Sequence, residues 1–288
     1  MFRAERRNII VILGGRAHDF GKLPVEELAV KTSKQGYSYI QLALAKAVAG
    51  IDTSLGKLSP GMGNYIRDVF KKENVQIAVL GCYINPIHPC IDERRKHLER
   101  FKEHIRFARD FGCSIVGTET GTLKSGGSSD YDNESEEAFE TFMESLRELV
   151  GEAERFGVIV GIEGGKNEVV TTPQRMRRVL DLIPSNNLQV IYDPTNYISL
   201  SNWEKQDQII NEAFELFGDR MIALHAKDFV VENNIIRTVP AGTGKLNYEL
   251  ILKRIKEKKP YIHILIEDIK EEYMNESMKF ITEVYEKI

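Results

Sequence analysis

Four short apolar runs in this sequence each end in an acidic or imidazole side chain, and this pattern most constrains the fold. The runs are VIVGIEGG, LQVIYDPTN, MIALHAKD and IHILIED, and the residues in question are Glu163, Asp193, His225 and Glu267. Each run has the length and aliphatic composition of a buried strand and gives way to a loop at a residue that is costly to bury alone. The four residues lie 30, 32 and 42 positions apart. This spacing predicts four consecutive strand–helix units of a closed parallel barrel, in which all strands end at the same rim.

The rest of the chain alternates between strand-like and helix-like segments in the same way. Strand patterns occupy 8–14, 38–44, 75–83 and 114–120, and helical patterns occupy 24–36, 61–74, 92–112 and 271–287. No GxGxxG motif follows the first strand, where GGRAHDFG stands instead, so an open dinucleotide-binding sheet is disfavoured. We therefore predict an α/β protein with a single (β/α)8 TIM barrel domain over residues 1–288, a common size for such barrels.

Charge and cysteine content narrow the classes of partner. The formal net charge is −4 at pH 7, so neither nucleic acid nor an anionic membrane is an expected partner. The apolar stretch NIIVIL is too short for a signal-peptide core or a bilayer span, and no other segment approaches a span. Cys82, Cys90 and Cys113 form no CxxC motif and are odd in number, which predicts reduced thiols and a cytoplasmic location. The sequence leaves open whether the chain forms a homo-oligomer.

The four strand-end residues predict a site for one divalent metal ion. Carboxylate oxygens and an imidazole nitrogen at one rim suit Mn²⁺, Co²⁺, Zn²⁺ or Mg²⁺. We expect the neutral nitrogen of His225 to face the ion and its other N–H to be fixed by a hydrogen-bond acceptor. The alternative for each residue taken singly is a helix cap or a pairing with lysine, and for Asp193, before Pro194, an Asx-type turn.

The same residues are suited to proton transfer beside a carbonyl group. A sugar isomerase or epimerase removes a proton from the carbon next to the carbonyl, and a divalent ion would stabilise the resulting enediolate. Glu163 and Glu267 come from the fifth and eighth predicted strands, across the barrel mouth, and are the predicted acid/base pair. Asp193 and His225 are expected to be ligands only. For epimerisation one carboxylate takes the proton and the other returns it on the opposite face, whereas for isomerisation one residue moves it between neighbouring carbons.

Five further residues are candidates for substrate contact, namely His88, Glu119, Asn196, Lys227 and Arg237. Glu119 ends the fourth predicted strand at the same rim, and Lys227 lies two residues after the histidine ligand and would point the same way. His88 follows the third strand, where polar and aromatic groups often line sugar pockets. The alternatives are loop anchoring for Glu119, a solvated loop lysine for Lys227 and a surface hairpin position for Arg237.

The late glycine-rich segment PAGTGKLN has two interpretations. It lacks the strand context of a nucleotide-binding loop, and we interpret it as a turn before a helix with Asn247 as the cap. The alternative is an anion site at the start of that helix, with Lys245 nearby.

The motifs GIEGG, TTP, YDPTN, HAKD, PAGTGKLNY and LIED, in this order, carry a family resemblance together with YINPIHP and GTETG. They resemble the xylose isomerase-like TIM barrels, a group of sugar phosphate isomerases and epimerases, over essentially the whole chain. The resemblance implies one divalent metal, often manganese, held by the four strand-end residues, and a small carbohydrate substrate. Arg237 resembles a family arginine that contacts substrate. Related epimerases often carry histidine where this chain has Asn196, which cannot readily replace imidazole as a metal ligand.

We therefore predict a metal-dependent isomerase or epimerase of a sugar, a sugar phosphate or a related keto-polyol. Two alternatives stay open, namely a keto-inositol dehydratase-type lyase on the same fold and a non-catalytic carbohydrate-binding barrel. The endonuclease branch of the fold resembles a three-zinc site built from many histidines. This chain has only six histidines and no basic face, so nucleic-acid processing is disfavoured.

Overall fold

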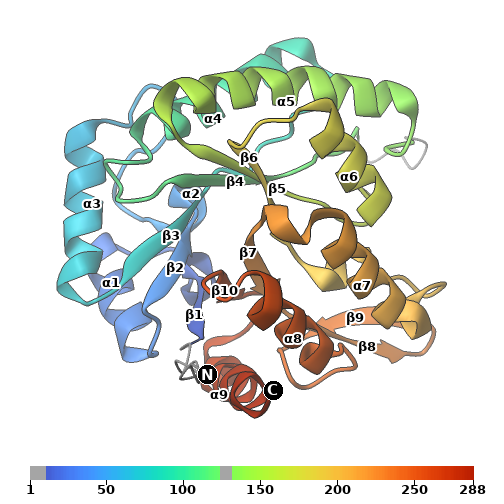
Figure 1. The fold of residues 1–288 in the computed structure, drawn as a ribbon. Coiled ribbons are helices and arrows are strands. Elements are labelled where there is room, and N and C mark those ends of the chain that lie inside the picture. Colours follow the sequence, from blue (N-terminus) through green and yellow to red (C-terminus); the bar gives the residue numbers. More distant parts are fainter. Residues whose placement is uncertain (1–10, 124–131) are drawn as a thin grey trace, which may run out of the picture.

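Within residues 11–123 and 132–288, which the computed structural model describes, eight parallel strands close into a barrel (Figure 1). Around the barrel the order is β1-β10-β7-β6-β5-β4-β3-β2. The strands are β1 (Ile12–Arg16), β2 (Tyr39–Leu42), β3 (Gln76–Gly81), β4 (Ile115–Glu119), β5 (Ile159–Glu163), β6 (Leu188–Tyr192), β7 (Met221–Ala226) and β10 (His263–Ile266). The predicted TIM barrel is confirmed. The last residues of the strand predicted over 8–14 overlap the start of β1, and its first residues lie outside the described part of the chain.

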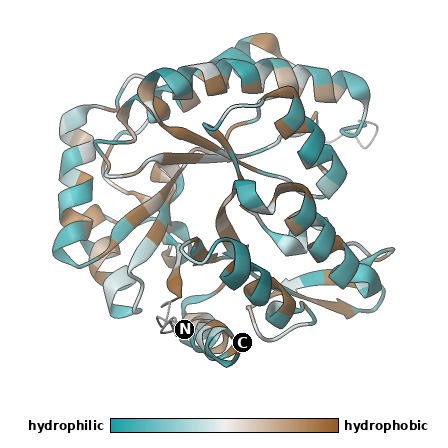
Figure 2. Ribbon diagram, viewed as in Figure 1, coloured by the Kyte–Doolittle hydropathy of each residue, from teal (hydrophilic) through white to brown (hydrophobic). Residues whose placement is uncertain are grey.

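The long helices form a ring outside the strands (Figure 1). They are α1 (Val25–Lys34), α3 (Pro60–Lys72), α4 (Ile91–Phe107), α5 (Glu136–Phe156), α6 (Pro173–Leu182), α7 (Gln206–Phe217), α8 (Tyr248–Lys258) and α9 (Glu271–Lys287). A short helix, α2 (Leu44–Ala47), directly follows β2. Figure 2 shows hydrophobic residues along the strands and polar residues over much of the outer helical surface, as expected for a core between barrel and helices. Among the described residues, no helix is both long and apolar enough to cross a membrane.

Polar caps set the start of several helices. Ser59, Thr172 and Asn247 are the N-cap residues of α3, α6 and α8, and each side chain accepts a hydrogen bond from a backbone N–H in the first turn. In α3 and α6 a proline follows the cap, where its missing N–H is not needed. The predicted cap at Asn247 is therefore confirmed. Each cap thus fixes the residue at which the loop ends and the helix begins.

A two-stranded antiparallel hairpin is inserted between β7 and α8. It consists of β8 (Asp228–Glu232) and β9 (Ile235–Val239), and it lies beside α7 and α8 at the edge of the barrel (Figure 1). Asn233 and Asn234 connect the two strands with positive φ angles of 49° and 59°. Two central residues with positive φ produce the tight turn that matches the twist of paired strands.

Candidate metal centre

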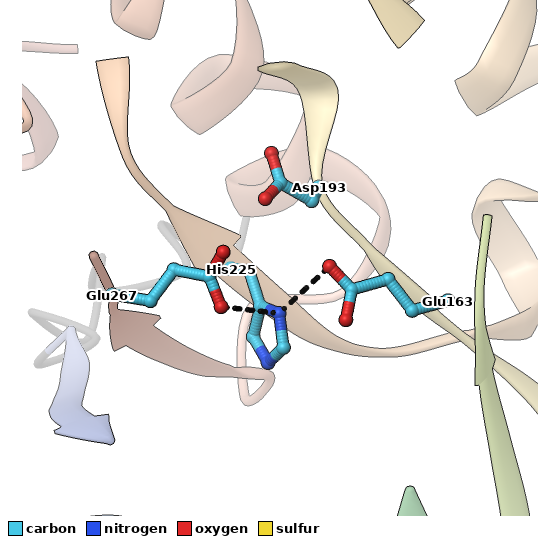
Figure 3. Close-up of side chains that lie close together, drawn as sticks. All are labelled: Glu163, Asp193, His225 and Glu267. Carbon is cyan, nitrogen blue, oxygen red and sulfur yellow. Dashed lines mark hydrogen bonds and ion pairs between the residues drawn. The ribbon is translucent and has the colours of Figure 1, made fainter. Parts of the chain in front are cut away.

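The four strand-end residues converge at the carboxyl end of the barrel (Figure 3). Glu163 is the last residue of β5, Asp193 and Glu267 directly follow β6 and β10, and His225 is the penultimate residue of β7. One ligand atom from each side chain lies within 4.8 Å of the others, and all four residues are buried. Side chains that are far apart in the sequence thus form one compact cluster of three carboxylates and one imidazole.

The chain around Glu163 and Asp193 is built for close packing. A Cβ atom at Gly164 would lie 2.5 Å from the Tyr197 hydroxyl and 2.7 Å from the Val170 carbonyl oxygen, so only glycine fits directly after Glu163. Asp193 Oδ1 accepts a hydrogen bond from the backbone N–H of Thr195 at 2.8 Å. The Asx-type turn is therefore present, and it leaves the second carboxylate oxygen directed into the cluster.

The imidazole of His225 lies between two carboxylates and a buried amide. Its Nδ1 atom is 3.1 Å from Glu163 Oε1 and 3.0 Å from Glu267 Oε2, and the two carboxylates approach from opposite sides (Figure 3). Its Nε2 atom is 2.8 Å from Oε1 of Gln41, a buried residue of β2. Gln41 Oε1 thus lies where an acceptor for the other N–H of His225 is expected.

Two cations contact the cluster from the barrel rim. Lys227 Nζ lies 2.6 Å from Glu267 Oε1 and 2.8 Å from Asp193 Oδ2, the latter without hydrogen-bond alignment. Arg16, the last residue of β1, lies 3.3 Å from Glu267 Oε2 and also pairs with Asp19 and Asp268. Glu267 is therefore held by three positively charged or protonatable groups.

This arrangement shifts the pKa values of the cluster in opposite directions. Burial alone would raise the pKa of Glu267, but His225, Lys227 and Arg16 together hold that pKa well below its usual range. Burial alone would lower the pKa of His225, but the Glu163 and Glu267 carboxylates outweigh it and raise the pKa well above its usual range. Burial raises the pKa of Asp193 to about 7, against the opposing charge of Lys227. Without a metal ion, these shifts favour a protonated His225 beside an ionised Glu267.

The donor set fits a divalent cation. Three carboxylates meet in this buried site. The Lys227 ammonium and the Arg16 guanidinium, which is shared with Asp19 and Asp268, offset only part of their charge when His225 is neutral, so further positive charge is needed to balance the site. One divalent ion supplies that charge, and oxygen and imidazole nitrogen are suitable ligands for it. The cluster could therefore hold one such ion through Glu163, Asp193, His225 and Glu267.

A polar cavity of about 360 Å³ opens over the cluster. Its walls include Glu163, Glu267, Lys227, Glu119, Asn196 and Glu168. A larger hollow of about 730 Å³ lies beside the starts of β2 and β3, where Tyr39 and Gln76 contribute to its wall. That hollow is at the opposite end of the strands from the acidic cluster, so the smaller cavity is the one relevant to the predicted chemistry.

The structure brings three of the five substrate-contact candidates to this cavity. Glu119, Asn196 and Lys227 line it, and Asn196 donates a hydrogen bond to Glu163 Oε1 at 2.9 Å. His88 does not line it, because it lies in the loop between β3 and α4 and its ring packs against His97 of α4. Arg237 does not line it either, because it lies on β9 with an exposed side chain paired to Glu232. The surface hairpin alternative for Arg237 therefore describes its position.

Several cavity residues were missed by sequence reasoning. Arg16 and Glu168 line the cavity but were not candidates, and neither was Gln41, which lies behind His225. Tyr83 also lines the cavity and was not among the five substrate-contact candidates. Gln41 carried a usable signal, because it is a lone polar residue inside the apolar run SYIQLAL. Glu168 carried none, since it lies in a loop and its carboxylate is brought inward by hydrogen bonds from the Thr120 backbone N–H and hydroxyl.

The PAGTG segment folds around a carboxylate of the protein. Asp228 accepts hydrogen bonds from the backbone N–H groups of Phe229, Gly242, Gly244 and Leu246. A Cβ atom at Gly244 would lie 2.3 Å from Asp228 Oδ1, which explains the glycine. The backbone donors of this segment are thus occupied by Asp228, and Asn247 caps the first turn of α8 by accepting the Leu250 N–H, so the turn interpretation is correct and the anion-site alternative is not supported.

Comparisons with known proteins identify the family of the chain and its fold. A family model described as xylose isomerase-like TIM barrel matches residues 30–284. A probable L-ribulose-5-phosphate 3-epimerase (UlaE) of Mycoplasma pneumoniae is 26% identical over 137 residues, which are 48% of this chain and 41% of that protein. The match thus spans less than half of the length of that curated relative.

Solved structures share the fold over nearly the whole chain. A xylose isomerase-like TIM barrel protein from Mycobacterium smegmatis, in complex with magnesium, has a TM-score of 0.75 at 15% identity and covers 99% of this chain and 98% of its own. A D-tagatose 3-epimerase-like protein has a TM-score of 0.74 at 18% identity and covers 96% and 99%. At these identities the likeness shows the fold alone. The family model supplies the assignment and confirms the resemblance seen in the motifs. This chain belongs to the xylose isomerase-like TIM barrel family.

Proposed function

We propose that this protein is a metal-dependent isomerase or epimerase of a small carbohydrate, with Glu163 and Glu267 as its acid/base pair. The observation that carries the proposal is the placement of these two carboxylates on opposite sides of His225, at the floor of a polar cavity (Figure 3). A substrate above His225 would have one carboxylate on each face. Epimerisation needs that arrangement, because the proton leaves from one face of a carbon and returns to the other.

The proton balance of the reaction follows from the two carboxylates. One of them, ionised, takes the proton from the carbon next to the carbonyl, and the electron pair of the C–H bond moves onto the carbonyl oxygen. The other, protonated, returns a proton to the opposite face of that carbon and becomes ionised. Exchange with water restores both groups for the next turnover. A single carboxylate that moves the proton between neighbouring carbons would instead give isomerisation.

The cation has one role in this scheme. A divalent ion held by Glu163, Asp193, His225 and Glu267 would supply positive charge beside the oxygen that becomes negative during proton removal. We propose Mn²⁺ as the first ion to test, followed by Mg²⁺, Zn²⁺ and Co²⁺, because three oxygens and one nitrogen suit all of them to different degrees. Lys227, paired with Asp193 and Glu267, keeps the total charge of such a site near neutral.

The substrate is proposed to be a sugar, a sugar phosphate or a related keto-polyol. The cavity of about 360 Å³ is at the small end of the usual range for ligand pockets, and its lining is rich in groups that bond hydroxyls. Glu119 and Asn196 are the proposed substrate contacts. Lys227 is proposed as a further contact through any N–H of its ammonium that Asp193 and Glu267 do not occupy. The partial match to a probable epimerase of a phosphorylated ketose favours epimerisation over simple isomerisation.

The enzyme is proposed to act in the cytoplasm as one domain over residues 1–288. Cys82, Cys90 and Cys113 are all unpaired thiols, which suits a reducing compartment.

Proton exchange with solvent tests the proposed function. The protein would be loaded with Mn²⁺ and incubated in D₂O with L-ribulose 5-phosphate, L-ribulose and D-tagatose, and loss of the C–H signal beside the carbonyl followed by ¹H NMR. We expect exchange with at least one of them, and Glu163→Gln and Glu267→Gln should each reduce its rate by roughly 10²- to 10⁴-fold. Glu152→Gln is the matched control, because Glu152 is a buried glutamate of α5 that is paired with Arg106 and does not line the cavity.

The outcomes separate this proposal from its alternatives. If purified protein binds no divalent ion, or if Glu267→Gln exchanges protons as fast as wild type, the mechanism is wrong. Metal binding without proton exchange would indicate a carbohydrate-binding barrel. Exchange followed by loss of a hydroxyl group would indicate a lyase.

A further inference from the structure

Gln41 is a buried polar residue in an otherwise apolar strand. It lies on β2, next to the buried residues Ile40 and Leu42, and only 1% of its surface is exposed. A side-chain amide in such a place is unfavourable unless its donors and acceptor are bonded. Both ends of this amide are bonded, and both partners belong to the candidate site.

The two bonds fix the direction of the amide. Gln41 Nε2 donates a hydrogen bond to the Tyr83 hydroxyl oxygen at 2.7 Å, which turns Oε1 toward Nε2 of His225 at 2.8 Å. An amide oxygen can only accept, so the hydrogen in the second bond belongs to the imidazole Nε2. In a neutral imidazole with Nε2 protonated, the lone pair is on Nδ1, and Nδ1 faces Glu163 and Glu267.

We propose that Gln41 is a positioning residue that holds His225 in the tautomer and ring orientation needed to bind the cation, and that Tyr83 holds Gln41 in turn. The inference rests on the proposed function, because it assigns residues behind the metal ligands of that site. Gln41 reaches the ion only through His225, and Tyr83 acts only through Gln41.

The surroundings of Tyr83 make it a firm support for the amide. Its ring is covered by the Lys46 ammonium, 3.8 Å from the ring centroid, and packs edge-on against His18 at 6.0 Å. Burial and the nearby carboxylates raise the pKa of Tyr83, so the hydroxyl stays neutral. A neutral hydroxyl oxygen with lone pairs accepts the Gln41 N–H without competing for the imidazole hydrogen.

Metal affinity measured by isothermal titration with Mn²⁺ tests the proposal. Gln41→Leu and Gln41→Met both remove the acceptor for Nε2 and should weaken Mn²⁺ binding roughly 10- to 100-fold. Gln41→Glu keeps an oxygen at that place and should restore most of the affinity. Tyr83→Phe keeps the ring but frees the amide to turn, and should weaken binding by a smaller factor, about 2- to 5-fold.

Two matched controls separate positioning from general destabilisation. Gln189→Leu makes the same change on β6, where Gln189 bonds the Asn186 carbonyl oxygen and not the cluster. Tyr285→Phe removes a buried hydroxyl of α9 that has no hydrogen-bond partner. Both should bind Mn²⁺ as wild type does. If the role of Gln41 were purely structural, its replacement would lower the melting temperature and leave the Mn²⁺ affinity of the folded protein unchanged.

A measurement on the wild-type protein covers the case in which the Gln41 variants do not fold. In Zn²⁺-loaded protein with ¹⁵N-labelled histidine, NMR should show His225 with metal-bound Nδ1 and a slowly exchanging hydrogen on Nε2. Metal on Nε2, or an unprotonated Nε2, would overturn the inference, as would wild-type Mn²⁺ affinity in folded Gln41→Leu. A wild-type protein that binds none of the tested ions overturns the proposed function itself, so the two failures are distinguishable.

Discussion

The Lys227 ammonium lies 2.6 Å from Glu267 Oε1, inside the cluster of candidate metal ligands. The same ammonium is 2.8 Å from Asp193 Oδ2, so it bridges two carboxylates that a divalent ion would also contact. Burial alone would lower the pKa of Lys227, but Asp193, Glu267 and Glu163 raise it above its usual range, so the charge is permanent. Lys227 therefore partly neutralises the cluster before any ion binds.

Replacement of Lys227 should make the stability of the protein more dependent on metal. Lys227→Met removes the only ammonium among the described residues that contacts Asp193, which should lower the free energy of unfolding of the metal-free protein by about 3 kcal/mol or more. A bound dication would offset part of this loss. Thermal unfolding in EDTA and in excess Mn²⁺ should therefore show a larger metal-induced rise in melting temperature for the variant than for wild type.

The control for this comparison is Lys245→Met, because Lys245 lies over the Trp203 ring outside the cavity. It should respond to Mn²⁺ as wild type does. An equal metal-induced rise in Lys227→Met would mean that Lys227 does not balance the charge of the cluster.

Glu168 should make the metal-free protein less stable as the pH rises. Burial is the main cause that raises the pKa of Glu168 from 4.5 to about 7. The Glu119 carboxylate raises it further, and the hydrogen bonds from Thr120 oppose the shift. The folded state therefore binds the proton more tightly, so the stabilising contribution is complete below pH 4.5 and is lost as the pH rises through 7. Glu168→Gln removes this dependence and should gain about 2 kcal/mol relative to wild type between pH 5 and pH 8. Urea unfolding in EDTA across this range measures the difference.

Glu215→Gln, at an exposed position of α7, serves as the control and should show no such trend. A difference between Glu168→Gln and wild type that stays constant from pH 5 to pH 8 would mean that Glu168 does not titrate there.

The barrel and its four converging residues were predictable because the signals are local. An apolar run of strand length that ends in Glu163 or Glu267 can be recognised from a few consecutive residues. Parallel topology then places all such strand ends at one rim. Helix ends were less predictable. The helix predicted over 92–112 stops at Phe107, and the chain then turns through Gly112 with a φ of 72°. The amphipathic pattern continues through that turn, so periodicity alone did not mark the end.

Contacts between residues that are distant in the sequence were not predictable. Gln41 and His225 are neighbours only after the barrel closes, and no local pattern links β2 to β7. Arg237 was placed near substrate through a motif match, but the hairpin inserted after β7 carries it to the surface. Lys227 was expected to reach a substrate oxygen, and the structure engages it with Asp193 and Glu267.

Asp228 should stabilise the conformation of the loop that leads into α8. Its carboxylate accepts hydrogen bonds from the backbone N–H groups of Phe229, Gly242, Gly244 and Leu246. Without the carboxylate, these donors would bond to water or lack a partner. We expect Asp228→Ala to lower the free energy of unfolding by about 3 kcal/mol. Limited proteolysis should cut the variant, but not wild type, between β9 and α8.

Asp52→Ala is the matched control, because Asp52 also accepts a backbone N–H, from Ser54, but in an exposed turn. Its loss of stability should be below about 1 kcal/mol. Equal losses in Asp228→Ala and Asp52→Ala would show that the four bonds do not hold the loop.

His104 should make the protein less stable as the pH falls. It is buried on α4 with Nδ1 2.8 Å from the Arg100 carbonyl oxygen, and burial is the main cause that lowers its pKa from 6.5 to about 4. Between these values the unfolded chain binds a proton that the folded state excludes. The contribution of neutral His104 is therefore complete above pH 6.5 and decreases by up to about 3 kcal/mol as the pH falls toward 4.

His104→Gln keeps a donor for the carbonyl but cannot titrate, so its free energy of unfolding should depend less steeply on pH between 4.5 and 6.5 than that of wild type. Urea unfolding at several pH values measures this slope. His88→Gln, in a half-buried loop position, should retain the wild-type slope. The flattening is expected to be partial, because burial also lowers the pKa of His18 to about 4 and its charge on protonation would face Arg16 and Lys46. Parallel curves for wild type and His104→Gln would mean that His104 does not contribute to the acid sensitivity.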